Sequence, residues 1–147
     1  LYSSGTRITE TVKLKVEDID FDQELIFIKE GKGKKDRYII TSQRFLDDLK
    51  HYLKIRKSSS SYIFDKSNKH ITVRTAERII KNSAVKAGID KRVYPHLLRA
   101  SIATYLIEDK VGIEQIKKLM GHARINTTLG YLRNRTDDIK EIKSPLD

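Results

Sequence analysis

Hydrophobic positions between Glu24 and Thr41 follow the pattern of two short strands. Two runs rich in β-branched and aromatic residues flank the connection Gly-Lys-Gly-Lys-Lys-Asp. Such runs, joined by a short glycine-containing loop, are typical of a β-hairpin. We therefore expect strands over 24–29 and 37–41, with a basic loop at the tip.

Helical spacing of apolar residues dominates the rest of the chain. Helices are predicted near Thr6, after Ser42, from Thr72 to Gly88, from Pro95 onward, and over 112–121, with a short one after Asn126 and a last amphipathic turn over 136–143. The helix after Thr72 is expected to bury Ala76, Ile79, Ile80, Ala84 and Ala87. The helix that starts at Pro95 is expected to bury Leu98, Ile102, Tyr105 and Leu106. His96 and Arg99 would then share the exposed first turns of that helix.

The order of these elements predicts the fold class. A small sheet comes early and helices follow, which indicates an α+β chain that is mostly α-helical. We expect a small antiparallel β-sheet near the N-terminus, packed against a helical bundle. A chain of 147 residues suits one domain, residues 1–147, with a sizeable core.

The charge balance indicates a polyanionic partner. Lys and Arg outnumber Asp and Glu by 30 to 20, which gives a formal charge of +10. Double-stranded DNA is the first expectation and an anionic membrane surface the second. No run approaches the ~20 apolar residues of a membrane span, and no signal segment opens the chain. With no cysteine present, we expect a cytoplasmic, nucleoid-associated protein without disulfides or thiolate chemistry.

Six polar residues at five places in the sequence are candidates for chemistry, and each place has an ordinary structural explanation when taken alone. They are Arg7, Lys32 in the hairpin loop, the pair His96 and Arg99, His122 after a helix end, and Tyr131. Taken singly, Arg7 would be a solvated surface residue and Lys32 would keep a sheet edge soluble. His122 would cap a helix end, and Tyr131 would be an aromatic residue that packs in the core. Together they offer several donors for phosphate oxygens and one hydroxyl nucleophile, which suffices for metal-free phosphoryl transfer.

Other reaction classes fit the sequence poorly. The acidic residues occur in polar stretches without a convergent set, which argues against a metal nuclease. The histidines are isolated, which argues against zinc, and no phosphate-binding loop motif is present. We expect no metal and no cofactor.

Four blocks in order resemble the catalytic domain of the tyrosine recombinases, the phage integrase and Xer-type family. The blocks are "SSGTRITETVKLKVEDID", "GKGKKDRYII", "HLLRASIATYL" and "IKKLMGHARINTTLGY". They cover nearly the whole chain, from Leu1 to about Arg133. The family commonly has histidine after the arginine of the third block, whereas this chain has Ala100.

The resemblance implies roles for the candidate residues. Tyr131 would be the nucleophile that forms a covalent 3′-phosphotyrosine, and Arg7 and Arg99 would clamp the non-bridging oxygens. His122 would add a donor, His96 would accept the tyrosine proton, and Lys32 would protonate the leaving 5′-oxygen. DNA-backbone contacts are expected from Lys34, Lys35, Arg37, Arg74, Arg78, Lys81 and Arg92.

The resemblance also implies an assembly and leaves alternatives open. The family acts as a homotetramer on DNA, with exchange of the C-terminal segment, here 136–147. The family places further helices and a DNA-clamping domain before the first arginine, so we expect this chain to be a fragment. A catalytically silent DNA-binding module, or DNA relaxation of the type IB topoisomerase kind, remain the alternative functions.

Overall fold

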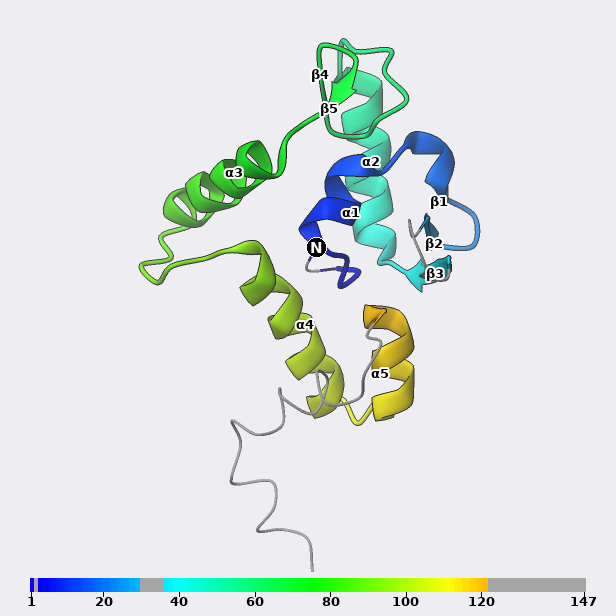
Figure 1. The fold of residues 1–147 in the computed structure, drawn as a ribbon, viewed down its shortest axis with the longest axis vertical. Coiled ribbons are helices and arrows are strands. Elements are labelled where there is room, and N and C mark those ends of the chain that lie inside the picture. The colour runs from blue at the N-terminus through cyan, green and yellow to red at the C-terminus, as the bar shows by residue number, and fades with distance from the viewer. Residues whose placement is uncertain (2, 30–35, 122–147) are drawn as a thin grey trace, which may run out of the picture. The chain divides into compact units, whose positions relative to one another are not determined.

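The structure, a computed structural model, describes residues 1, 3–29 and 36–121. The chain divides into two compact units, residues 1–102 and 103–147. Figure 1 shows the helices and strands in chain order. The described elements are mostly helical, with a small antiparallel sheet early in the chain, which confirms the predicted fold class. Among these residues, no helix has both the length and the apolar character needed to cross a bilayer.

The sheet in the first unit has the strand order β1-β2-β3 and is antiparallel throughout. Its strands are β1 (Ile19–Asp20), β2 (Leu25–Ile28) and β3 (Arg37–Ile40). Ile26 lies opposite Ile39 in the β2–β3 register. The hairpin predicted from the two apolar runs is confirmed.

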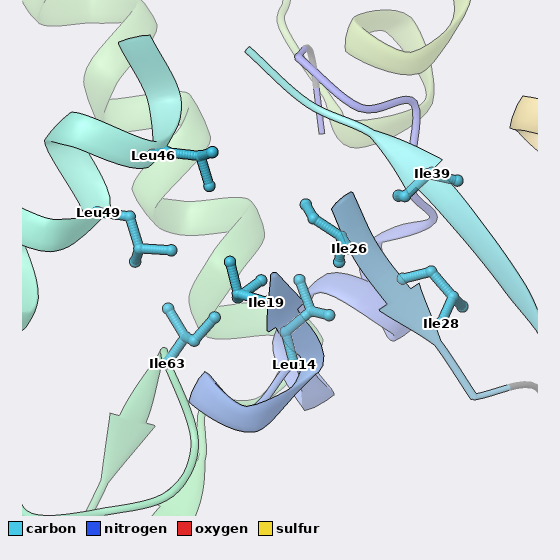
Figure 2. Close-up of a cluster of buried hydrophobic side chains, with 8 residues drawn as sticks. All are labelled: Leu14, Ile19, Ile26, Ile28, Ile39, Leu46, Leu49 and Ile63. Atoms are coloured by element: carbon cyan, nitrogen blue, oxygen red, sulfur yellow. The ribbon is translucent and has the colours of Figure 1, made fainter. Parts of the chain in front are cut away.

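The core of the first unit lies between this sheet and helix α2 (Gln43–Ile55). The side chain of Ser42 caps α2 by accepting a hydrogen bond from the Phe45 amide at 3.3 Å, as expected. Alternate residues of β2 point inward, because successive side chains in a strand face opposite sides. Figure 2 shows the cluster, which consists of Leu14, Ile19, Ile26, Ile28, Ile39, Leu46, Leu49 and Ile63.

The first unit contains four further short elements among the described residues. Helix α1 (Ile8–Lys13) packs against helix α3 (Val73–Lys86) and is followed by a single 3₁₀ turn, η1 (Val16–Asp18). Strands β4 (Asp65–Lys66) and β5 (Lys69–His70) form a second hairpin that the apolar pattern does not predict. Strands of two residues are too short to show an alternation.

Helix α3 (Val73–Lys86) begins and ends where the sequence predicts. The Thr72 hydroxyl accepts a hydrogen bond from the Thr75 amide at 3.1 Å, and Gly88 follows the helix with φ +68°. Ala76 and Ala84 are buried as expected. The expectations for Ile79 and Ala87 were wrong, because 52% of the surface of Ile79 is exposed and Ala87 is exposed as well.

Helix α4 (Pro95–Glu108) starts at the predicted proline but buries a different face. Arg99 is only 5% exposed, which corrects the expectation that it lies on the surface. Tyr105, expected inside, is 56% exposed. The buried face runs instead through Arg99 and Ala103, one helical turn apart. His96 is exposed, as expected.

Helix α5 (Ile113–Met120) lies in the second unit. Ile116 and Met120 are fully buried. Gly121 ends the helix in the left-handed conformation, with φ 60°, as the sequence predicts.

Candidate active site

Arg7, the first candidate site residue in the chain, lies at the end of the turn that leads into α1. Gly5 adopts φ +62°, a conformation that residues with a Cβ reach only at a cost. The neighbouring Thr6 is 1% exposed, and its hydroxyl lies 2.8 Å from the hydroxyl of Thr11. The Thr11 hydroxyl in turn donates to the Arg7 carbonyl at 3.0 Å. These bonds fix the backbone of Arg7 as the N-cap of α1.

Arg99 reaches this turn from α4. Its guanidinium Nη1 donates a hydrogen bond to the carbonyl oxygen of Gly5. A buried guanidinium needs such acceptors, because an unpaired charge away from water is costly. Since Gly5 and Arg7 are two residues apart, their Cα atoms are within about 7 Å of each other. The arginine of α4 is therefore held beside the backbone that carries Arg7.

The carboxylate of Glu10 joins Arg7 to Arg37. Arg7 Nη1 donates to Glu10 Oε1 at 2.7 Å, and the Arg7 amide donates to Oε2 at 2.8 Å. Arg37 Nη2 donates to the same Oε2 at 2.9 Å. The amide contact has the form of a capping box, in which a glutamate at the third helical position reaches back to the N-cap. The result is a cluster of two guanidinium groups around one carboxylate.

The pairing with the two arginines changes the pKa of Glu10. Burial on its own would raise the pKa of the carboxyl, but the hydrogen bonds from Arg37 and Arg7 lower it to about 2. Glu10 is therefore ionised at every pH at which the protein would act.

Arg7 opens onto a hollow of about 320 Å³ on the surface of the first unit. Its lining is rich in charge and comes from α1, η1 and β2. The charged residues that line it are Arg7, Glu10, Lys13, Lys15, Asp18 and Lys29. This hollow is open to solvent and predominantly basic, so it can admit an anion.

A second basic surface follows α3. Arg74, Arg78 and Lys81 line one hollow of about 460 Å³. Lys81 also lines a neighbouring hollow of about 510 Å³ together with Arg92 and Tyr94. The Arg92 guanidinium lies 5.9 Å from the centre of the Tyr94 ring. Four of the residues expected to bind the DNA backbone are thus on adjoining surfaces.

The structure accounts for some of the expected site residues and places others differently. It brings Arg99 to the turn of Arg7 and leaves His96 exposed on the same helix as Arg99. The Arg37 side chain is 11% exposed and is turned toward Glu10. The remaining expected residues lie outside the described ranges; they are Lys32, Lys34, Lys35, His122 and Tyr131.

Sequence reasoning missed Glu10. A signal was present, because glutamate three residues after an N-cap position is the spacing of a capping box. Arginine is an unusual N-cap, so the pattern around Arg7 and Glu10 was not recognised. The pairing with Arg37, 27 positions away, left no local signal.

Comparison with known proteins agrees with this fold. A crystal structure of XerA recombinase superposes with a TM-score of 0.85 and 31% identity, covering 95% of this chain and 53% of that one. The Tn1549 transposon integrase in complex with transposon right end DNA gives a TM-score of 0.78 at 20% identity, over 94% of this chain and 53% of that one. The class of fold is that of the tyrosine recombinases.

The family assignment follows from sequence as well as from fold. Tyrosine recombinase XerA of Pyrococcus furiosus is 39% identical over 145 residues, which are 96% of this chain and 50% of that protein. Residues 1–137 match the model of the Phage integrase family. The chain belongs to that family, which confirms the resemblance seen in the four blocks. It spans about half the length of the curated relative.

Proposed function

We propose that residues 1–147 form the catalytic domain of a tyrosine site-specific recombinase, which cleaves and rejoins DNA without metal. The observation that carries the proposal is the hydrogen bond from Arg99 to the Gly5 carbonyl. It joins the arginine of one family block to the turn of another. Membership of the Phage integrase family supports the same function.

In the proposed reaction, the Tyr131 hydroxyl attacks the scissile phosphorus. The new bond joins the tyrosine oxygen to phosphorus, and the bond from phosphorus to the 5′-oxygen breaks. His96 accepts the tyrosine proton, and Lys32 supplies a proton to the leaving 5′-oxygen. Rejoining is the reverse reaction with the 5′-hydroxyl of another strand, so no external energy source is required.

Arg7 and Arg99 would stabilise the charge that develops on the non-bridging oxygens. Guanidinium suits this task, because it remains charged and donates through a planar fork. His122 would add a third donor. The solvent-open hollow at Arg7 supports access of a phosphate to that residue.

DNA is the proposed substrate and partner. A structure of the Tn1549 integrase, which shares this fold, holds that protein in complex with transposon right end DNA. The basic hollows along α3 support backbone contacts by Arg74, Arg78, Lys81 and Arg92. We extend the proposal to Lys34 and Lys35, to tetramer assembly through residues 136–147, and to a place in the cytoplasm at the nucleoid.

The test is a covalent trap. The full-length protein is incubated with a pool of nicked duplexes of randomised sequence, from which cleavage releases a short strand that diffuses away. We expect a complex between protein and DNA that survives denaturation, and sequencing of the trapped DNA gives the target. Tyr131→Phe should bind DNA and give no such complex; a covalent band from this variant contradicts the assignment of the nucleophile.

Two further outcomes separate the alternatives. A wild-type protein that binds DNA but never forms the covalent complex would be a silent binding module. Relaxation of a supercoiled plasmid without a paired target site would indicate a topoisomerase-like enzyme. The proposal requires recombination between two DNA molecules that each carry the target sequence identified by the covalent trap.

A further inference from the structure

The ion pair between Arg37 and Glu10 connects two blocks of the proposed active site that are distant in sequence. Arg37 is the first residue of β3, five positions after Lys32 in the sequence. Glu10 lies in the first turn of α1. Its carboxylate accepts hydrogen bonds from the guanidinium of Arg7 and from the backbone amide of Arg7. The carboxylate therefore contacts the strand of one block and the arginine of the other.

We propose that Arg37 is a positioning residue that acts through Glu10 on Arg7 and does not itself contact DNA. This inference rests on the proposed recombinase function, in which Arg7 clamps the scissile phosphate. It assigns Arg37 a role different from the DNA-backbone contact expected from its place in a basic segment.

The exposure of the three side chains supports the proposal that Arg7 contacts the phosphate and that Arg37 acts through Glu10. The Arg7 side chain is 29% exposed, whereas those of Glu10 and Arg37 are each 11% exposed. Arg7 and Glu10 line the solvent-open hollow, and Arg37 is not part of that lining. A phosphate that enters the hollow thus meets Arg7 first, with Glu10 next to it and Arg37 on the side of the sheet.

Charge gives the second reason. Glu10 alone would neutralise Arg7, and a neutral pair would attract a phosphate weakly. Arg37 balances the carboxylate, so the group of three retains one net positive charge at Arg7. The same hydrogen bonds restrict the Arg7 guanidinium to one orientation, which a developing charge can use without reorganisation.

The other charged groups around Glu10 do not replace Arg37. The charged residues that share the hollow, besides Arg7 and Glu10, are Lys13, Lys15, Asp18 and Lys29. Lys15 pairs with Glu17, and Lys29 pairs with Glu17 and Asp18. Arg37 is the partner that donates directly to Glu10 from the sheet.

The first experiment compares Arg37→Met and Arg37→Lys with wild type in the full-length protein. The substrate is the nicked duplex trapped by wild type. We expect Arg37→Met to lower the single-turnover cleavage rate about 10- to 100-fold, because small misplacements of a clamping group are costly. DNA affinity and its salt dependence should stay near wild type. Arg37→Lys, which keeps a positive charge and a nitrogen that can donate to Glu10, should recover most of the rate.

A control variant on α3 gives the changes in DNA affinity and salt dependence that are expected when a direct DNA contact is lost. Arg74→Gln, at an exposed position on a basic surface, should weaken DNA binding and reduce its salt dependence. If Arg37→Met behaves in the same way, Arg37 contacts DNA and the inference is wrong. Wild-type cleavage by Arg37→Met also overturns it.

A double-mutant cycle tests whether the effect passes through Glu10. If Arg37 acts through this carboxylate, Arg37→Met should cost little further in a Glu10→Gln background. Equal losses in both backgrounds would contradict the inference. Should Arg37→Met fail to fold, Glu10→Gln and Arg37→Lys still decide it: the proposal requires reduced cleavage with unchanged affinity in the first and a smaller loss in the second.

A final measurement does not depend on activity. NMR titration of the Glu10 carboxyl should give a higher pKa in Arg37→Met than in wild type, because the variant lacks the hydrogen bond from Arg37 that lowers the pKa of Glu10 to about 2. Identical titration in both proteins contradicts the positioning inference. A wild-type protein that never forms the covalent complex contradicts instead the proposed function, so the two failures are read from separate measurements.

Discussion

The guanidinium of Arg99 donates to the carbonyl of Gly5 across 94 positions of sequence. The carbonyl belongs to a glycine with φ +62°, in the turn that leads to Arg7. The backbone conformation of Gly5 therefore determines where the acceptor for Arg99 lies. Substitutions at either residue should affect the other.

Gly5→Ala should lower both stability and cleavage. A Cβ in the left-handed region costs about 1 kcal/mol, and relaxation of the turn moves the carbonyl that Arg99 requires. We expect the free energy of unfolding to fall by about that amount, with a loss of cleavage rate of about tenfold or more. Urea unfolding and the single-turnover trap measure the two effects.

Gly88→Ala provides the control for this prediction. Gly88 has φ +68°, and a Cβ added there would meet nothing within 4 Å. The same backbone strain then occurs without any contact to Arg99. We expect a similar loss of stability with cleavage unchanged. Equal loss of cleavage in both variants would show that stability alone explains the effect of Gly5.

Arg99→Lys should reduce cleavage while DNA binding persists. Lysine keeps the charge, but its single ammonium cannot hold the Gly5 carbonyl and a phosphate in the planar geometry of guanidinium. The loss of such a donor typically costs about 10² to 10³ in rate. Single-turnover cleavage checks this; a rate within threefold of wild type would show that Arg99 has no part in the clamp.

Local chemistry made much of the fold predictable. Ser42 and Thr72 cap the helices that follow them, and Gly88 and Gly121 follow helix ends, because each of these roles depends only on neighbours in sequence. The β2–β3 hairpin was predictable for the same reason. Its two apolar runs are adjacent, and their alternation decides which face is buried.

Tertiary contacts decided what the sequence could not show. The apolar pattern of α4 predicted an exposed Arg99, since its acceptor at Gly5 is remote in sequence. Arg37 was interpreted as a DNA contact because it follows a basic loop, while its partner Glu10 lies on another element. Both arginines depend on acceptors that only the fold brings to them.

The ion pairs of Glu10 should make stability depend on acidity. The pKa of Glu10 is about 2 in the folded protein, below its ordinary value of 4.5, so the folded state binds this proton less readily than the unfolded state. The stabilisation is complete above about pH 4.5 and is lost as the pH falls toward 2. Because solvent screens part of the interaction at Arg7, we expect a contribution of roughly 1–2 kcal/mol.

Glu10→Gln should remove this pH dependence. Urea unfolding at pH 3 and at pH 6 should show a smaller difference in the variant than in wild type. Glu17→Gln is the matched control, because Glu17 pairs with Lys15 and Lys29 but is 61% exposed. Exposed pairs contribute little, so this variant should behave as wild type. If Glu10→Gln retains the full dependence, other carboxylates are responsible.

Arg74 and Arg78 should each contribute one phosphate contact on DNA. The two are one helical turn apart on α3, both are exposed, and both line the same hollow. Each phosphate contact releases condensed counterions, so log K falls as log salt rises, with a slope whose magnitude is about 0.9 per contact. Arg74→Gln and Arg78→Gln should each reduce the slope by about one, and each should weaken binding by a similar factor for DNA of different sequences.

Lys54→Gln is the control for this prediction, because it removes the same charge at an exposed position on another helix, α2. If all three variants change the slope equally, total charge governs binding; a change confined to the α3 variants locates the DNA backbone along this helix.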